Sequence, residues 1–158
     1  MNQKPWKVYA FWIVLTEAVG GLGGFLIRDG VRRYAETALK PPGTPPELVF
    51  PIVWTILYAL MGVSAARIDL SDGRDRLSKS LFLYLIQLGF NFLWSIFFFR
   101  MQAYGFSFVW LLLLWGLILA MILAFVKKDR LAGWLQIPYL IWVSYAGYLN
   151  LGVWLLNR

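Results

Sequence analysis

Aromatic and amide side chains recur at helical spacing in three separate apolar stretches of the sequence. Residues three, four or seven positions apart share one face of an α-helix. The three sets are Trp54 with Tyr58, Gln87 with Asn91, Trp94 and Phe98, and Tyr139 with Trp142, Ala146 and Asn150. Aromatic faces with a few fixed polar groups make a pocket that suits a flat, hydrophobic and partly polar ligand.

Three of these side chains are amides, and an amide is costly in hydrocarbon unless it is hydrogen-bonded. We therefore expect Gln87, Asn91 and Asn150 to face the inside of a helix bundle. Two roles stay open for them. They could tie neighbouring helices together, or they could line a ligand pocket.

Glu17 is the one charged side chain inside the apolar stretches. A carboxylate in such a place is by default a functional hypothesis, such as a proton relay or a counter-ion. It could equally stay protonated because of desolvation and donate a hydrogen bond to a neighbouring helix. These stretches contain no lysine, arginine or histidine as a partner, which favours the protonated, structural role.

Absent residue types exclude most familiar catalytic sites. The sequence has no histidine and no cysteine, so it cannot form imidazole or thiolate metal sites, a cysteine nucleophile or a Ser-His-Asp triad. We expect no metal site and no cofactor. An enzymatic role is not the favoured interpretation, although chemistry that needs none of these groups stays open.

The elements that must position these side chains are membrane helices. Of the 158 residues, 60% are hydrophobic and 15% charged, whereas a soluble domain has about 45–50% and 25%. One helical crossing needs about 20 apolar residues, and five stretches provide them: 8–27, 50–66, 80–99, 106–126 and 134–156. The sequence predicts an all-α integral membrane protein, with residues 1–158 in a single five-helix membrane domain. The first stretch exceeds the apolar core of a cleavable signal, so it should be retained.

The connection at residues 28–47 differs from the others, because it holds four of the seven prolines. Proline fixes φ and stiffens the chain, and loops of this length are often functional lids. We therefore expect a preshaped lid over the end of the bundle, and the alternative is a rigid strap without a role in ligand binding. The predicted lid residues are Tyr34, Lys40, Pro41, Pro42, Pro45 and Pro46.

Lysines and arginines set the expected orientation and partners. Counted on alternate sides of the five spans, nine lie with the N-terminus and six on the other face. The positive-inside rule then predicts a cytoplasmic N-terminus and an external C-terminus. Because these cations flank apolar spans, membrane lipids are the expected partners and nucleic acid is not.

Two further patterns concern packing. Four tryptophans near span ends predict an interfacial aromatic belt, namely Trp6, Trp12, Trp110 and Trp134. Small residues at four-residue spacing allow helices to approach closely, and three such runs occur: Gly20 with Gly24, Gly62 with Ala66, and Gly116 with Ala120 and Ala124. We expect them to pack helices within one chain, and the alternative is a homodimer seam.

Several motifs together resemble the translocator protein family, also called tryptophan-rich sensory proteins or peripheral-type benzodiazepine receptors. They cover roughly residues 20–154 and match a bacterial-type member. The motifs are Lys40-Pro41, Pro45-Pro46, Trp54-x-x-Leu57-Tyr58-x-x-Met61-Gly62, Gln87-Leu88-x-x-Asn91-x-x-Trp94, Phe97-Phe98, and Pro138-Tyr139-Leu140-x-Trp142 with Leu149-Asn150 and Val153-Trp154.

The resemblance implies five transmembrane helices around a pocket beneath the first loop, in a bacterial cell membrane. It implies porphyrin binding, and in some members sterols and synthetic ligands. Carried over residue by residue, it implies a pocket lined by Trp54, Asn91, Trp94, Trp142 and Ala146, with residues 34–46 as the lid.

This sequence also departs from the family pattern. Pro42-Gly43 stands where many relatives have Ser-Trp, and Trp110 stands where they tend to have an acid. Leu151 and Gly152 replace tyrosines of the proposed sterol pattern, which is itself weak, so the resemblance does not predict sterol binding through it. Ile86 replaces a small residue in the third helix, where relatives form a dimer contact.

Three functions stay open. The leading hypothesis is a membrane protein that binds porphyrins and acts as a sensor or transporter of tetrapyrroles. The second is light-dependent porphyrin breakdown, in which Trp54 and Trp142 would steer the reaction. The third is a structural or partner-binding scaffold that uses the Gly116, Ala120 and Ala124 seam.

Overall fold

The computed structural model describes residues 4–73 and 77–158, and these residues form helices and no strand. Five helical segments are long and apolar enough to cross a membrane, so the predicted five-helix membrane protein is confirmed. The elements are α1 (Pro5–Thr37), α2 (Val49–Ser71), α3 (Lys79–Ser95) with the π-helical turn η1 (Ile96–Arg100), α4 (Tyr104–Lys128), and the short α5 (Arg130–Trp134) followed by α6 (Ile137–Leu156).

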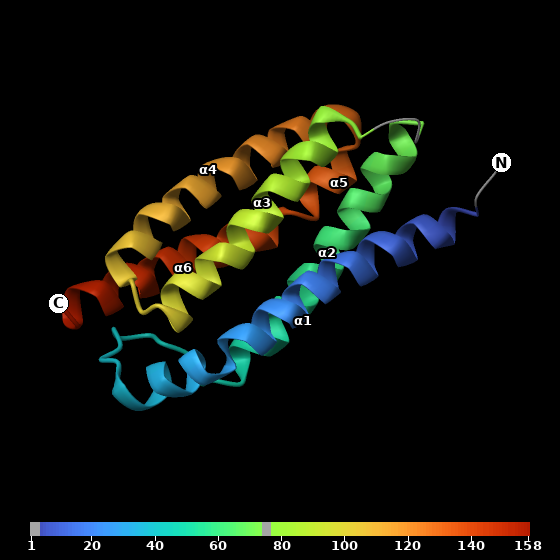
Figure 1. The fold of residues 1–158 in the computed structure, drawn as a ribbon. Coiled ribbons are helices and arrows are strands. Elements are labelled where there is room, and N and C mark those ends of the chain that lie inside the picture. Colours follow the sequence, from blue (N-terminus) through green and yellow to red (C-terminus); the bar gives the residue numbers. More distant parts are fainter. Residues whose placement is uncertain (1–3, 74–76) are drawn as a thin grey trace.

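The helices lie lengthwise in one bundle (Figure 1). The start of α1, the end of α2, the start of α3, and α5 lie at one end. The first loop and the C-terminus lie at the other, which we call the loop end. Pro51 and Pro138 fall in the first turns of α2 and α6, where a proline removes no helical hydrogen bond.

The first helix is longer than predicted, and the loop is shorter. The structure continues α1 to Thr37, so the predicted loop boundary at residue 28 is wrong. Hydropathy falls after Ile27, but charge does not end a helix, and no proline occurs between Ile27 and Pro41. The residue directly before a proline is biased toward extended backbone, and the chain is already extended at Ala38, at φ −81° and ψ 134°.

Two glycines let α1 and α2 approach closely. A Cβ at Gly62 would lie 2.6 Å from Ile13 Cα, and one at Gly20 would lie 2.3 Å from Tyr58 Cε2. Gly20 and Gly62 therefore pack helices within the chain, as expected, whereas a Cβ at Gly24 would meet no described atom within 4 Å. The third run does not, because a Cβ at Gly116 meets no described atom within 4 Å. The dimer alternative for that run stays a prediction.

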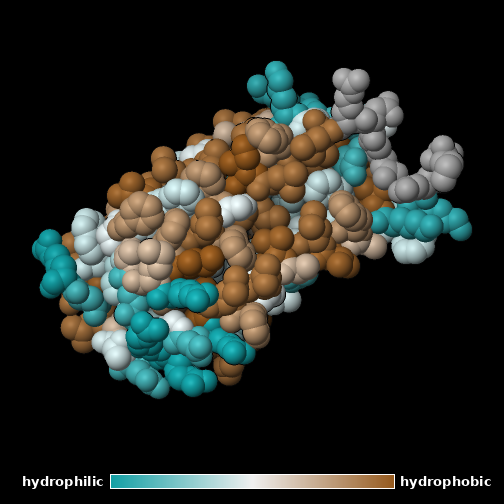
Figure 2. Space-filling model, in the orientation of Figure 1, coloured by the Kyte–Doolittle hydropathy of each residue, from teal (hydrophilic) through white to brown (hydrophobic). Residues whose placement is uncertain are grey.

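The outer surface of the bundle is apolar over its middle and polar at its ends (Figure 2). Large apolar side chains such as Phe11, Phe25, Ile52, Leu112 and Ile141 are exposed on it. A soluble monomer rarely exposes an apolar surface of this extent. Hydrocarbon chains of a bilayer are the environment that covers such a surface without cost.

The structure corrects part of the predicted aromatic belt. Trp6 and Trp134 are exposed, but Trp12 is buried. Its indole Nε1 donates to Asp69 Oδ2 at 2.8 Å, and its ring meets Tyr84 edge-on at 5.7 Å. Trp12 therefore ties α1 to α2, because a partner far away in the sequence satisfies its N–H.

Two ion pairs close the end of the bundle opposite the loop end. Arg67 lies 2.8 Å from Asp129 Oδ2, and Lys128 pairs with Asp72. Asp129 also accepts from the backbone N–H groups of Leu131 and Ala132 and so caps α5. Burial raises the pKa of Asp129, but these N–H groups and the Arg67 guanidinium outweigh burial and hold that pKa below its usual value.

We expect the protein to lose stability in acid partly through Asp129. Its folded-state pKa lies below the unfolded value of about 4, so its stabilising contribution is complete above that pH and is lost as pH falls through the folded pKa. Thermal melting between neutral and strongly acidic pH measures the loss. Asp129→Asn can still cap α5 but cannot pair with Arg67, so its melting point should fall less in acid. An unchanged fall would contradict this role.

Candidate functional site

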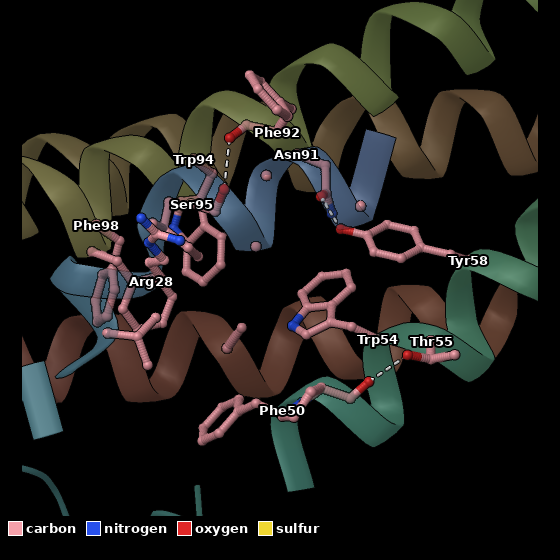
Figure 3. Close-up of a pocket in the computed structure, with 18 of the residues that line it drawn as sticks. Arg28, Phe50, Trp54, Thr55, Tyr58, Asn91, Phe92, Trp94, Ser95 and Phe98 are labelled. Carbon is pink, nitrogen blue, oxygen red and sulfur yellow. Dashed lines mark hydrogen bonds between the residues drawn. The ribbon is translucent and has the colours of Figure 1, made fainter. Parts of the chain in front are cut away.

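A cavity of about 650 Å³ lies inside the loop half of the bundle. Its walls come from α1, α2, α3 with η1, and α6, and Figure 3 shows side chains from these helices pointing into the space between them. Ligand pockets in proteins are typically about 300–1,000 Å³. We call this space the aromatic cavity.

The structure brings most of the predicted site residues together and separates the others. The predicted residues that line the aromatic cavity are Tyr34, Trp54, Tyr58, Asn91, Trp94, Phe98, Trp142 and Ala146. The predicted residues outside its lining are Tyr139, Lys40, Pro41, Pro42, Pro45 and Pro46. Tyr34 belongs to α1 and not to the loop, since the helix runs past it.

Tyr139 shares a helix face with Trp142, but it is fully buried behind the cavity wall. Its hydroxyl donates to Gln87 Oε1 at 2.8 Å and accepts from Asn91 Nδ2 at 3.0 Å. The Tyr58 hydroxyl donates to Asn91 Oδ1 at 2.9 Å. Tyr139 therefore positions Asn91, and the predicted direct contact with a ligand is not supported by its place in the structure.

A second amide network lies nearer the loop end. Asn150 Oδ1 accepts from Trp94 Nε1 at 3.0 Å and from Ser107 Oγ at 3.1 Å, and its Nδ2 donates to the Tyr104 carbonyl at 2.9 Å. These bonds fix the Trp94 ring at the cavity wall. Asn91 and Asn150 both tie helices together and line the cavity, so the two predicted roles of the amides coexist.

The aromatic rings that line the cavity form two groups. Trp54 stacks with Tyr58 at a centroid distance of 5.4 Å and meets Trp142 edge-on at 6.5 Å. Trp94 stacks with Phe98 at 5.4 Å. Figure 3 shows Trp54 and Phe50 of α2 on the opposite side of the cavity from Trp94 and Phe98. The cavity therefore offers aromatic surfaces on two sides.

The proline-rich loop is anchored to α6 and the C-terminus. Tyr148 Oη donates to the Pro42 carbonyl at 2.7 Å, and the Tyr145 hydroxyl donates to the Gly43 carbonyl. Asn157 bonds both backbone groups of Leu39. Only Glu47 and Leu48, at the end of this loop, line the aromatic cavity. Most of the loop forms a strap at the loop end, and a lid role for its prolines stays a prediction.

Sequence reasoning missed the glycines of the α1 wall and the π conformation of the turn that carries Phe98. Gly21 and Gly24 line the cavity, and the run of small residues beside Glu17 was the available signal. The π turn is fixed by packing, because a Cβ at Gly30 would lie 2.4 Å from the Phe99 carbonyl oxygen. No local sequence pattern specifies that contact. It places Phe98 in the cavity wall.

Glu17 lines the cavity at the end away from the loop. It is half-buried and forms no hydrogen bond or ion pair with another residue that the structure describes. The structural hydrogen bond to a neighbouring helix, which the sequence favoured, is therefore not found. The carboxyl group remains available to the cavity.

The indole N–H of Trp142 is a second polar group without a partner. Its Nε1 is buried and has no hydrogen-bond acceptor among the described residues. A buried donor without a partner costs about 1–3 kcal/mol. An acceptor brought by a bound molecule would remove that cost.

Fold and site together define a class: a five-helix membrane protein with an aromatic cavity in one half of the bundle. The model of the TspO/MBR family matches residues 12–155, and the chain belongs to that family. It is 39% identical over 150 residues to the tryptophan-rich protein TspO of Chlorobaculum tepidum, covering 94% of each chain.

Two further relatives are similar over nearly their whole length. The tryptophan-rich sensory protein of Cereibacter sphaeroides is 33% identical over 152 residues, covering 96% of this chain and 92% of the relative. The human translocator protein is 34% identical over 154 residues, covering 95% of this chain and 90% of the relative. The motifs recognised in the sequence therefore reflect membership of the family.

Proposed function

We propose that the protein binds porphyrins and similar flat, hydrophobic molecules in the aromatic cavity, and acts as a membrane sensor or transporter of tetrapyrroles. The observation that carries this proposal is the cavity itself, which is lined by one tryptophan from each of three helices: Trp54, Trp94 and Trp142. The flat faces of a porphyrin ring would stack on these indoles. The names of the sensory and translocator relatives support the role.

Polar groups at the wall suit the edges of such a ligand. Arg28 lines the cavity, and a guanidinium binds carboxylates well, so it would pair with a porphyrin propionate. The Lys40 ammonium already donates to the carbonyls of Ala35 and Ala38 at 3.1 and 3.3 Å. The Trp142 N–H offers one further donor.

Tryptophan fluorescence tests the proposal. Protoporphyrin added to the protein in lipid nanodiscs should quench the emission and reach saturation at a fixed ratio of ligand to protein. Empty nanodiscs mixed with free tryptophan in the buffer provide the correction for inner-filter absorption by the porphyrin. Quenching that grows without saturation would contradict binding in the cavity.

A second candidate function is light-dependent porphyrin breakdown, with porphyrin and oxygen supplying the reactivity. The contact of Trp54 with Tyr58 and Trp142 favours it, because electron-rich rings would surround the excited ligand. A new pigment should form with protein under illumination, remain absent in darkness and be lost in Trp54→Phe or Trp142→Phe. Identical bleaching in detergent alone would contradict the activity.

We also propose that the N-terminus lies in the cytoplasm of a bacterial cell. Seven of the nine cations on that side lie within the described residues, and Arg74 and Arg76 lie outside them. Because the chain has no cysteine, single replacements can report topology. Thr37→Cys, at the loop end, should react with a membrane-impermeant maleimide on intact cells, whereas Ser71→Cys should react only after lysis. The reverse labelling would overturn the orientation.

A further inference from the structure

We propose that Glu17 selects, among flat hydrophobic molecules, those that carry an N–H or ammonium donor. The inference rests on the proposed function, since it concerns the ligand of the same cavity. It begins from a carboxyl group that lines the aromatic cavity and makes no hydrogen bond or ion pair with any described residue.

The surrounding residues leave this carboxyl group without a donor of their own. Tyr58 is close enough to interact with Glu17 electrostatically, and its ring packs on Gly20, one turn along α1. Its hydroxyl, however, donates to Asn91 Oδ1 at 2.9 Å. Asn91 in turn donates its amide to Tyr139 at 3.0 Å. These polar groups at this end of the cavity therefore hydrogen-bond to one another, and none of them donates to Glu17.

The α1 wall also separates two opposite charges. Arg28 follows Glu17 by eleven residues, which is about three turns and roughly 16 Å along the same helix face. Between them, Gly21 and Gly24 line the cavity, and a Cβ at either position meets no described atom within 4 Å. Glycines therefore form much of this wall, with Val19 and Ile27 beside them, a carboxyl group at the inner end and a guanidinium toward the loop end.

This arrangement fits a flat ligand that places a donor at Glu17. An ammonium group brought by the ligand favours the ionised form of Glu17, and a carboxylate in a low-dielectric site binds an N–H or ammonium group more strongly than a neutral acceptor does. A ligand with a carboxylate in the same position would meet like charge. A ligand with an ammonium donor should therefore bind about tenfold more tightly than a matched ligand with a neutral hydroxyl group, given the usual gain from a charge-assisted hydrogen bond.

Three pyrene derivatives test this selection, because they share one flat apolar body. We would measure energy transfer from tryptophan to pyrenemethylamine, pyrenemethanol and pyrenecarboxylate in zwitterionic nanodiscs, counting only the saturable part. The wild-type protein should prefer the amine over the alcohol by about tenfold and bind the acid most weakly. Glu17→Gln should abolish the preference while alcohol binding stays within about twofold, and Glu17→Asp should keep it.

Glu36→Gln is the matched control, because it removes the same charge from α1 outside the cavity lining. It should leave the preference unchanged. Saturable binding of all three probes with the same ranking in wild type and Glu17→Gln would overturn this inference and leave the proposed function standing. Absence of saturable binding for every probe would overturn both.

Discussion

Trp142→Ala is expected to weaken protoporphyrin binding by roughly 1–3 kcal/mol, because the change removes a stacking surface from the cavity wall. Trp142 lines the cavity beside Trp54 and carries the buried N–H that lacks a partner. Alanine also removes that donor. The porphyrin absorbance change in an equilibrium titration measures the loss without depending on tryptophan emission.

Trp134→Ala is the matched control for this change. Trp134 is exposed on the outside of the bundle and does not line the cavity, so its removal should leave the affinity within about twofold, as is usual for surface changes. Equal losses in the two variants would show that the porphyrin binds to the outer surface. An unchanged affinity in Trp142→Ala would show that this indole does not contribute to porphyrin binding.

The second large effect is expected on stability. Gly62→Val should lower the free energy of unfolding by about 1–3 kcal/mol or more, the usual cost of overpacking. A Cβ at Gly62 would lie 2.6 Å from the Cα and 2.9 Å from the backbone N of Ile13. Backbone atoms cannot rotate away, so α1 and α2 would have to separate. Unfolding in dodecyl sulfate, followed by circular dichroism, measures the change.

Gly116→Val provides the comparison, because it makes the same chemical change where a Cβ meets no described atom within 4 Å. Its free energy of unfolding should stay within about 0.5 kcal/mol of the wild-type value. A loss as large as that of Gly62→Val would mean that Gly116 also lies against a helix, such as one from a second copy of the chain.

The sequence predicted the parts of the site that depend on local periodicity. Trp54 with Tyr58, and Asn91 with Trp94, repeat at helical spacing, and the structure places all four at one cavity. An amide within an apolar span has to turn inward, which is why Asn91 could be placed in the bundle from the sequence alone.

The remaining features depend on contacts between distant residues. Trp12 looks interfacial from its position in α1, but Asp69 satisfies its N–H across the bundle. Tyr139 shares a face with Trp142, yet its hydroxyl is held by Gln87 and Asn91 behind the wall. Hydropathy reports where a chain leaves the hydrocarbon, and it does not report where a helix ends. The extension of α1 to Thr37 was therefore not predictable from it.

The central claim is that a porphyrin binds inside the aromatic cavity, and Ala146 offers the most direct test of it. Ala146 lies in the α6 wall, one turn from both Trp142 and Asn150, so Ala146→Phe would fill the space with little change elsewhere. Native mass spectrometry of both proteins with protoporphyrin counts the molecules bound. We predict one protoporphyrin per wild-type chain and none on folded Ala146→Phe, whereas equal occupancy of the two proteins would contradict the account.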